Sequence, residues 1–284
     1  MNFIMKKIRY LLEGVVVYAF YYFFYLLSLE LASKVGSNLL RLIGKFVKEN
    51  KTAKKNFNRC FPTLPLNDKQ KIIKNTWSHF GAVIGEIPHW KNLSRVKFFK
   101  RIKIINEENI PYNKSILFSG HLGNWELITK IAEEYNIKLN LVYRPSNNPY
   151  VSHLINKMRK NSQVKLIPKG LLGIKKILNA LNNNEVVAIM IDQKIHNGIT
   201  VPFFNMDAMT ISLPASIALK YKIQLIPLNI IRTKRSYYTA TFYKPLLITN
   251  SDTKYTIMKK LNSILEGWIR KHPEQWFWFH NRWE

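Results

Sequence analysis

The chain has 284 residues, of which 47% are hydrophobic and 13% aromatic, so it can form a folded core and is not a disordered chain. Its single cysteine, Cys60, excludes an intramolecular disulfide and a zinc site built on cysteines. The formal net charge of +27 predicts polyanionic partners, namely nucleic acid, an anionic membrane surface or acidic substrates. A genome whose base composition favours Lys and Asn codons would also produce such an excess of positive charge.

The first 31 residues have the pattern of a membrane anchor. A basic segment ending at Arg9 precedes an apolar, aromatic-rich stretch that stays uncharged between Glu13 and Glu30. This stretch is somewhat shorter than the roughly 20 residues of a comfortable span, and no small-x-small cleavage site follows it. We expect residues 1–31 to form an uncleaved membrane helix that spans the bilayer or lies in its interface, with the basic flank cytoplasmic. A helix buried in the protein core is the alternative.

The remainder, residues 32–284, is predicted to be one α/β domain. Residues 31–60 have a basic, helical pattern that Pro62 and Pro65 end, and from residue 115 onward strand and helix patterns alternate. The expected strands cover residues 115–119, 139–143, 164–167, 185–191, 223–231 and 237–247, and the expected helices begin near residues 124, 150, 173, 212 and 254. Such alternation implies βαβ crossovers, and therefore a mostly parallel central sheet flanked by helices.

The turn after the strand at residues 115–119 holds the strongest candidate for chemistry. It reads HLGNWE at residues 121–126 and lies beyond the carboxyl end of a strand, where such sheets bind ligands. His121 is a candidate general base because its ordinary pKa lies near neutrality. Glu126 can meet it only if His121 lies in the turn and Glu126 in the first helical turn, since five residues span roughly 140° of an ideal helix. The spacing alone is a weak signal, and the bend that Gly123 permits strengthens it.

Residues 121–126 resemble the H-x4-D/E motif of glycerolipid acyltransferases, in the HxGNWE form typical of the lipid A biosynthesis (lauroyl/myristoyl) acyltransferase family. Other segments are similar to that family in the expected order: residues 143–145, 147–149, 184–187, 192–193, 198–204, 210, 214–215, 226–227 and 272–283. Asn205 and Asn281 depart from the family pattern, which affects local loop conformation rather than the reaction. The resemblance covers nearly the whole chain and implies a glycerol-3-phosphate-acyltransferase-like single domain.

This resemblance also implies an activity. A fatty acyl chain would move from acyl carrier protein to a hydroxyl of a lipid A precursor of the Kdo-lipid IVA type, in lipopolysaccharide or lipooligosaccharide biosynthesis. His121 would take the proton of the hydroxyl as it attacks the thioester, with Glu126 or Asp192 as the acidic partner of His121. Neither a metal nor a cofactor is required.

The expected substrate-binding residues are Gly123, Asn124 and Arg144. Asn124, Arg144 or backbone N–H groups of the turn would stabilise the tetrahedral oxyanion. The expected partners are acidic acyl carrier protein, a phosphorylated glycolipid acceptor and an anionic membrane, with the catalytic domain on the cytoplasmic face of the bacterial inner membrane.

Three alternatives remain open at this point. The chain could acylate another glycolipid or a lysophospholipid, bind nucleic acid through its positive charge, or act as a non-catalytic membrane scaffold. No nucleic-acid partner is expected, because the basic residues are scattered and no RNA- or DNA-binding signature accompanies them.

Overall fold

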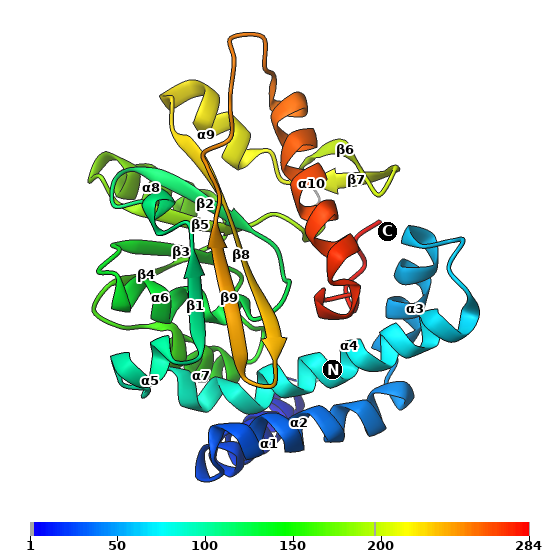
Figure 1. The fold of residues 1–284 in the computed structure, drawn as a ribbon. Helices are drawn as coiled ribbons and strands as arrows, with labels where there is room; N and C mark the ends of the chain where they lie inside the picture. The colour runs from blue at the N-terminus through cyan, green and yellow to red at the C-terminus, as the bar shows by residue number, and fades with distance from the viewer. Residues whose placement is uncertain (1–2, 196, 284) are drawn as a thin grey trace.

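A computed structural model describes residues 3–195 and 197–283. Its centre is a seven-stranded sheet in the order β1-β9-β8-β2-β5-β3-β4 (Figure 1). Neighbouring strands run parallel except for the antiparallel pair β8 and β9. The strands are β1 (Ile102–Ile105), β2 (Ser115–Ser119), β3 (Leu139–Tyr143), β4 (Val164–Pro168), β5 (Val186–Met190), β8 (Gln224–Lys234) and β9 (Tyr237–Phe242). The predicted α/β fold with a mostly parallel sheet is therefore confirmed.

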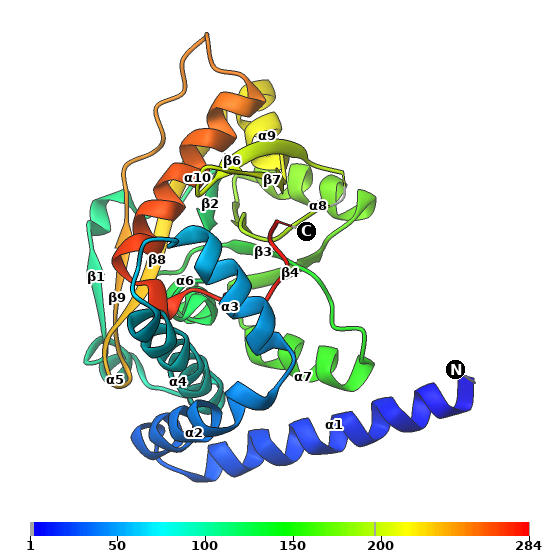
Figure 2. The same ribbon diagram turned by 90° about the vertical axis from the view of Figure 1, so that its right-hand side faces the viewer.

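Helices cover both faces of this sheet (Figure 2). The helices of the described residues are α1 (Phe3–Leu26), α2 (Leu29–Ile43), α3 (Glu49–Cys60), α4 (Leu66–Trp90), α5 (Arg95–Phe99), α6 (Ile128–Glu134), α7 (Pro149–Arg159), α8 (Leu171–Asn182), α9 (Leu213–Tyr221) and α10 (Lys254–Lys271). Of these, α1 and α2 pack against other helices rather than on the sheet. Two clusters of buried apolar side chains fill the space between the sheet and the helices. The central strand β2 is buried at every position, because β5 and β8 flank it and a cluster lies on each face.

The sequence patterns missed the edge strand β1 and a separate hairpin of β6 (Ile199–Phe203) and β7 (Met206–Thr210). Strand β1 has four residues, and its pairing partner β9 follows more than a hundred residues later, so no local pattern marks it. The last predicted strand was too long, since β9 ends at Phe242.

The predicted N-terminal membrane helix is wrong as a membrane-spanning element. Within residues 3–195 and 197–283, no helix combines the length and the apolar character that crossing a bilayer requires. Helix α1 carries charged residues as far as Glu13 and ends at Leu26. Its uncharged part is therefore about 20 Å long at 1.5 Å per residue, against an apolar bilayer core of about 30 Å. In the structure α1 packs against α4 and α7, and its outer face is exposed (Figure 2).

Helices α2 and α4 approach each other backbone to backbone. A Cβ atom added to Gly36 would lie 2.3 Å from the carbonyl oxygen of Gly81, and one added to Gly81 would lie 2.1 Å from that of Gly36. Only glycine allows this separation. The contact fixes α4 beneath the tip of the β8–β9 hairpin and beside the turn that follows β2 (Figure 1).

Candidate active site

The turn after β2 has a tightly determined backbone. Gly123 has a φ angle of 61°, and a Cβ atom there would lie 1.8 Å from the carbonyl oxygen of Ile230 in β8. Any other residue would be strained and would collide with β8. A short 3₁₀ helix (Trp125–Leu127) then leads into α6. We call residues 120–126 the catalytic turn, after the role predicted for His121.

His121 pairs with Asp192, which follows strand β5. The distance from Nδ1 of His121 to Oδ1 of Asp192 is 2.7 Å, and the backbone N–H of His121 donates to Oδ2 over 2.6 Å. Because a carboxylate only accepts, Nδ1 carries a proton, and in the neutral imidazole the lone pair is therefore on Nε2. The imidazole side chain is 16% exposed and the carboxylate is fully buried. This arrangement leaves Nε2 able to accept a proton from a bound substrate.

The carboxylate of Asp192 is held by the C-terminal segment as well. Trp276 donates its indole N–H to Oδ2 over 2.8 Å, and Nε2 of His280 lies 2.9 Å from the backbone oxygen of Asp192. Burial by itself would raise the pKa of Asp192, but the charge of His121 and the hydrogen bonds from it outweigh burial and lower that pKa. Asp192 therefore stays ionised and can stabilise the imidazolium that forms on His121.

Glu126 makes a different pair. Both of its carboxylate oxygens accept from the guanidinium of Arg159 at the end of α7, with a distance of 2.7 Å from Nε to Oε2. The indole N–H of Trp125 donates to Oε1 over 3.1 Å. Burial opposes ionisation, but the charge and hydrogen bonds of Arg159 lower the pKa of Glu126. The structure thus places Asp192, not Glu126, in hydrogen-bond contact with His121, and the catalytic roles of all three stay predictions.

Two openings lie beside His121. A cavity of about 50 Å³ is lined by His121, Trp125, Glu126, Leu141, Val142, Tyr143, Arg159, Lys169, Met190 and Gln193. A groove of about 460 Å³ is lined by Arg144, Pro145, Ser146, Asn147, Gln193, Lys194, His280 and Asn281. Gln193 belongs to both, and its amide nitrogen lies 3.5 Å from Nε2 of His121. The groove, which contains Arg144 and Lys194, is therefore related to the cavity at His121 through the shared Gln193.

The other predicted binding residues do not face these openings. Asn124 is fully buried, and its side-chain N–H donates to the hydroxyl of Tyr238 over 3.4 Å. The backbone N–H groups of Leu122, Gly123 and Asn124 donate to carbonyl oxygens of Gly120, Gln275 and Ile230. These backbone groups are thus occupied within the protein. Arg144 and Gln193, in contrast, line the groove, and Gln193 also lines the cavity at His121.

Sequence reasoning missed the role of Arg159 and of the C-terminal residues around Asp192. Arg159 has no distinguishing local pattern, because it is one of the two basic residues in the last turn of α7. Trp276 belongs to an aromatic-rich run at residues 276–283, and nothing in that run marks one ring as the partner of a carboxylate. Only the folded chain shows that its indole N–H holds a carboxylate.

A comparison with protein families identifies the family to which this chain belongs. The profile described as bacterial lipid A biosynthesis acyltransferase matches residues 4–284. The chain belongs to this family. It is accordingly an O-acyltransferase of lipid A synthesis, and the resemblance carried by residues 121–126 is confirmed.

Individual relatives agree with this membership. A lipid A biosynthesis acyltransferase of Haemophilus influenzae is 25% identical over 81% of this chain and 76% of that protein. A lipid A biosynthesis palmitoleoyltransferase of Escherichia coli is 22% identical over 87% of this chain and 83% of its own length. Among solved structures, the 1-acyl-sn-glycerophosphate acyltransferase of Thermotoga maritima matches 80% of this chain and 98% of its own with a TM-score of 0.41 and 11% identity.

Proposed function

We propose that this family member transfers a fatty acyl chain from acyl carrier protein to a hydroxyl of a Kdo-lipid IVA type lipid A precursor. The observation that carries the proposal is the His121–Asp192 pair, with Nδ1 and Oδ1 2.7 Å apart and Nε2 beside a cavity. Such a pair is the general-base half of an acyl-transfer site. It needs no nucleophile from the protein, because the acceptor hydroxyl is itself the nucleophile.

The proposed reaction has two steps on one tetrahedral centre. Nε2 of His121 takes the proton of the acceptor hydroxyl, whose oxygen forms a bond to the thioester carbonyl carbon. The oxyanion that forms accepts hydrogen bonds from Gln193 and Arg144. The carbon–sulfur bond then breaks, and the imidazolium returns the proton to the departing thiolate of the carrier. The products are an ester and a free thiol, and His121 is neutral again.

The distribution of charge supports both proposed substrates. Arg144 and Lys194 line the groove beside His121 and can meet phosphate groups of a glycolipid. The net charge of +27 attracts an acidic carrier protein and anionic headgroups. We therefore place the enzyme at the cytoplasmic face of the bacterial inner membrane, with no nucleic-acid partner.

The test is an acyl-transfer assay with radiolabelled acyl-acyl carrier protein and a tetra-acylated lipid A precursor. His121→Ala should lower kcat by about 10²- to 10⁴-fold. His153→Ala is the matched control, because His153 is an exposed histidine of α7, and it should keep the wild-type rate. Transfer by a folded His121→Ala variant at the wild-type rate would overturn the mechanism. Wild-type transfer to a lysophospholipid but not to the lipid A precursor would overturn the proposed acceptor.

A further inference from the structure

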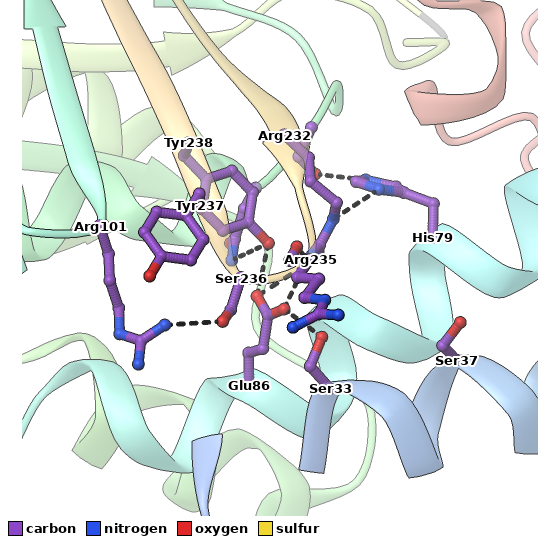
Figure 3. A network of polar contacts seen from close by, with 12 residues as sticks. Ser33, Ser37, His79, Glu86, Arg101, Arg232, Arg235, Ser236, Tyr237 and Tyr238 are labelled. Carbon is purple, nitrogen blue, oxygen red and sulfur yellow. Dashed lines mark hydrogen bonds and ion pairs between the residues drawn. The ribbon is translucent and has the colours of Figure 1, made fainter. Parts of the chain in front are cut away.

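A polar network reaches Gly123 and Asn124 of the catalytic turn and takes no part in the reaction above. Figure 3 shows its members. Its members are Ser33 of α2, His79 and Glu86 of α4, Arg232 of β8 and Tyr238 of β9. Glu86 has 0% and Tyr238 1% of its surface exposed. None of the five lines the described cavity beside His121. Burying ionic groups costs desolvation free energy unless they are well paired. We therefore asked what this network does at the turn.

One branch of the network ends on the backbone of Gly123. Arg232 forms an ion pair with Glu86, with 2.5 Å between Nη1 and Oε1, and its Nε donates to Nδ1 of His79 over 3.1 Å. Nε2 of His79 then lies 3.0 Å from the carbonyl oxygen of Gly123. Since Nδ1 accepts from Arg232, Nε2 carries the proton and donates to Gly123. Burial, together with the charge of Arg232, lowers the pKa of His79 to about 3, so the imidazole is neutral at neutral pH.

A second branch reaches the neighbouring residue, Asn124. Oε2 of Glu86 accepts from the hydroxyl of Tyr238 over 2.5 Å, and that hydroxyl accepts from the side-chain amide of Asn124 over 3.4 Å. Ser33 donates to Oε1 of the same carboxylate over 2.6 Å. Glu86 is thus the common anchor of two chains of hydrogen bonds that meet adjacent residues of the catalytic turn.

The backbone of Arg232 supplies a third connection. Gln275 exchanges two hydrogen bonds with it, from the N–H of Arg232 over 2.8 Å and to its carbonyl oxygen over 2.9 Å. The carbonyl oxygen of Gln275 accepts from the N–H of Gly123 over 2.9 Å. Gly123 is therefore held at both its N–H and its carbonyl oxygen by groups that Arg232 positions.

We propose that Glu86, Arg232 and His79 are positioning residues, which fix the peptide of Gly123 and thereby orient His121 for proton transfer. His121 lies two residues before this peptide, so a shift of Gly123 moves the imidazole relative to Asp192 and the substrate. A displacement of about 1 Å at a reacting group costs on the order of 10²-fold in rate. The loss should fall on kcat, because none of the three residues lines the cavity at His121 or the groove beside it. His79 and Arg232 line a separate cavity of about 1000 Å³, which has no part in the proposed reaction.

The test compares two replacements of His79. His79→Phe keeps a ring of similar size but removes the donor to Gly123, and should lower kcat by about 10²-fold with KM within about threefold of wild type. His79→Gln keeps an amide N–H near the place of Nε2 and should recover most of that loss. Glu185→Gln is the matched control, because Glu185 is 7% exposed, close to the 8% of His79. Its carboxylate accepts a hydrogen bond from the side chain of Asn140 over 2.8 Å, at the opposite end of the strands from His121. It should leave kcat unchanged.

Because the kinetic arm depends on the proposed function, amide hydrogen exchange supplies an independent measurement. Peptides covering residues 119–127 should exchange faster in His79→Phe than in wild type, and at the wild-type rate in Glu185→Gln. Unchanged exchange and unchanged kcat in His79→Phe would overturn the positioning role, as would equal loss of kcat in the Glu185→Gln control. If wild type transfers no acyl group to the lipid A precursor, the proposed acceptor fails, and the exchange rates still decide the role of His79.

Discussion

Replacing Asp192 by asparagine should invert the proton positions on His121 without changing the shape of the site. In the wild-type enzyme, Oδ2 accepts from two N–H groups, the backbone of His121 over 2.6 Å and the indole of Trp276 over 2.8 Å. Oδ1 accepts from one, Nδ1 of His121 over 2.7 Å. An asparagine must turn its NH₂ group toward one of these sides. If the NH₂ group took the place of Oδ2, the two buried N–H donors there would be left without an acceptor, at a cost of about 1–3 kcal/mol each. The NH₂ group should therefore take the place of Oδ1 and face Nδ1.

With an N–H opposite it, Nδ1 must accept, and the proton moves to Nε2. Nε2 can then no longer take a proton from the acceptor hydroxyl. General-base catalysis contributes about 10²- to 10⁴-fold. The same exchange in a Ser-His-Asp hydrolase costs about 10⁴-fold through the wrong tautomer. We therefore expect kcat of Asp192→Asn to fall by about 10³- to 10⁴-fold, with little change in KM.

The assay is steady-state transfer from labelled acyl-acyl carrier protein, with circular dichroism to establish that the variant is folded. Asp252→Asn is a suitable control, because Asp252 also has a lowered pKa, through hydrogen bonds from Lys260, Thr249 and Thr256, but lies just before α10. A folded Asp192→Asn variant with kcat within tenfold of wild type would refute the assigned tautomer and the role of Asp192.

Three further predictions concern residues of this turn and one residue that contacts it, His79. Glu126→Gln should lower kcat by about tenfold, less than Asp192→Asn, because Glu126 does not contact the imidazole; equal losses in the transfer assay would contradict this. Gly123→Ala should destabilise the protein by about 2–4 kcal/mol in urea denaturation, since its added Cβ would lie 1.8 Å from a backbone oxygen. Gly267→Ala, in open space on α10, should instead stabilise it by about 0.5–1 kcal/mol, and the reverse order would be inconsistent with this packing. Because the folded-state pKa of His79 is lowered from 6.5 to about 3, the unfolded chain binds the extra proton in this window. As the pH is lowered from 6.5 toward 3, the free energy of unfolding should therefore fall more steeply in wild type than in His79→Gln, by up to about 1.4 kcal/mol per pH unit, and equal pH slopes would speak against a buried neutral histidine.

Local patterns predicted the fold well where each strand is apolar throughout. Strand β2 was predicted with its observed limits, because it is a short apolar run that ends in a glycine-containing turn. Because the end of that strand could be predicted, the position of the turn that contains His121 could be predicted as well. The membrane helix failed because the helix stops at Leu26, which the apolar composition of the segment does not reveal.

The acidic partner of His121 could not be decided from the sequence. Asp192 is 71 residues away from His121, and only the parallel pairing of β2 with β5 brings the ends of the two strands together. Glu126 is near in sequence but is drawn toward Arg159, whose position depends on the packing of α7. Neither the contact of His121 with Asp192 nor that of Glu126 with Arg159 has a local sequence signature, because both depend on which elements become neighbours in the fold.

The hydrogen bonds around Asp192 also bear on how the protein is made. The carboxylate is held by Trp276, and its backbone by His280, so the pair with His121 is complete only when these late residues have been synthesised and have packed. Such long-range contacts form late and slowly compared with local ones. The growing chain should therefore acquire most of its sheet before it acquires a working base, and no acyl thioester should be consumed by an unfinished polypeptide. A chain cut short before residue 276 would lack the indole N–H that holds Asp192, together with the buried side chains of Trp276 and Trp278.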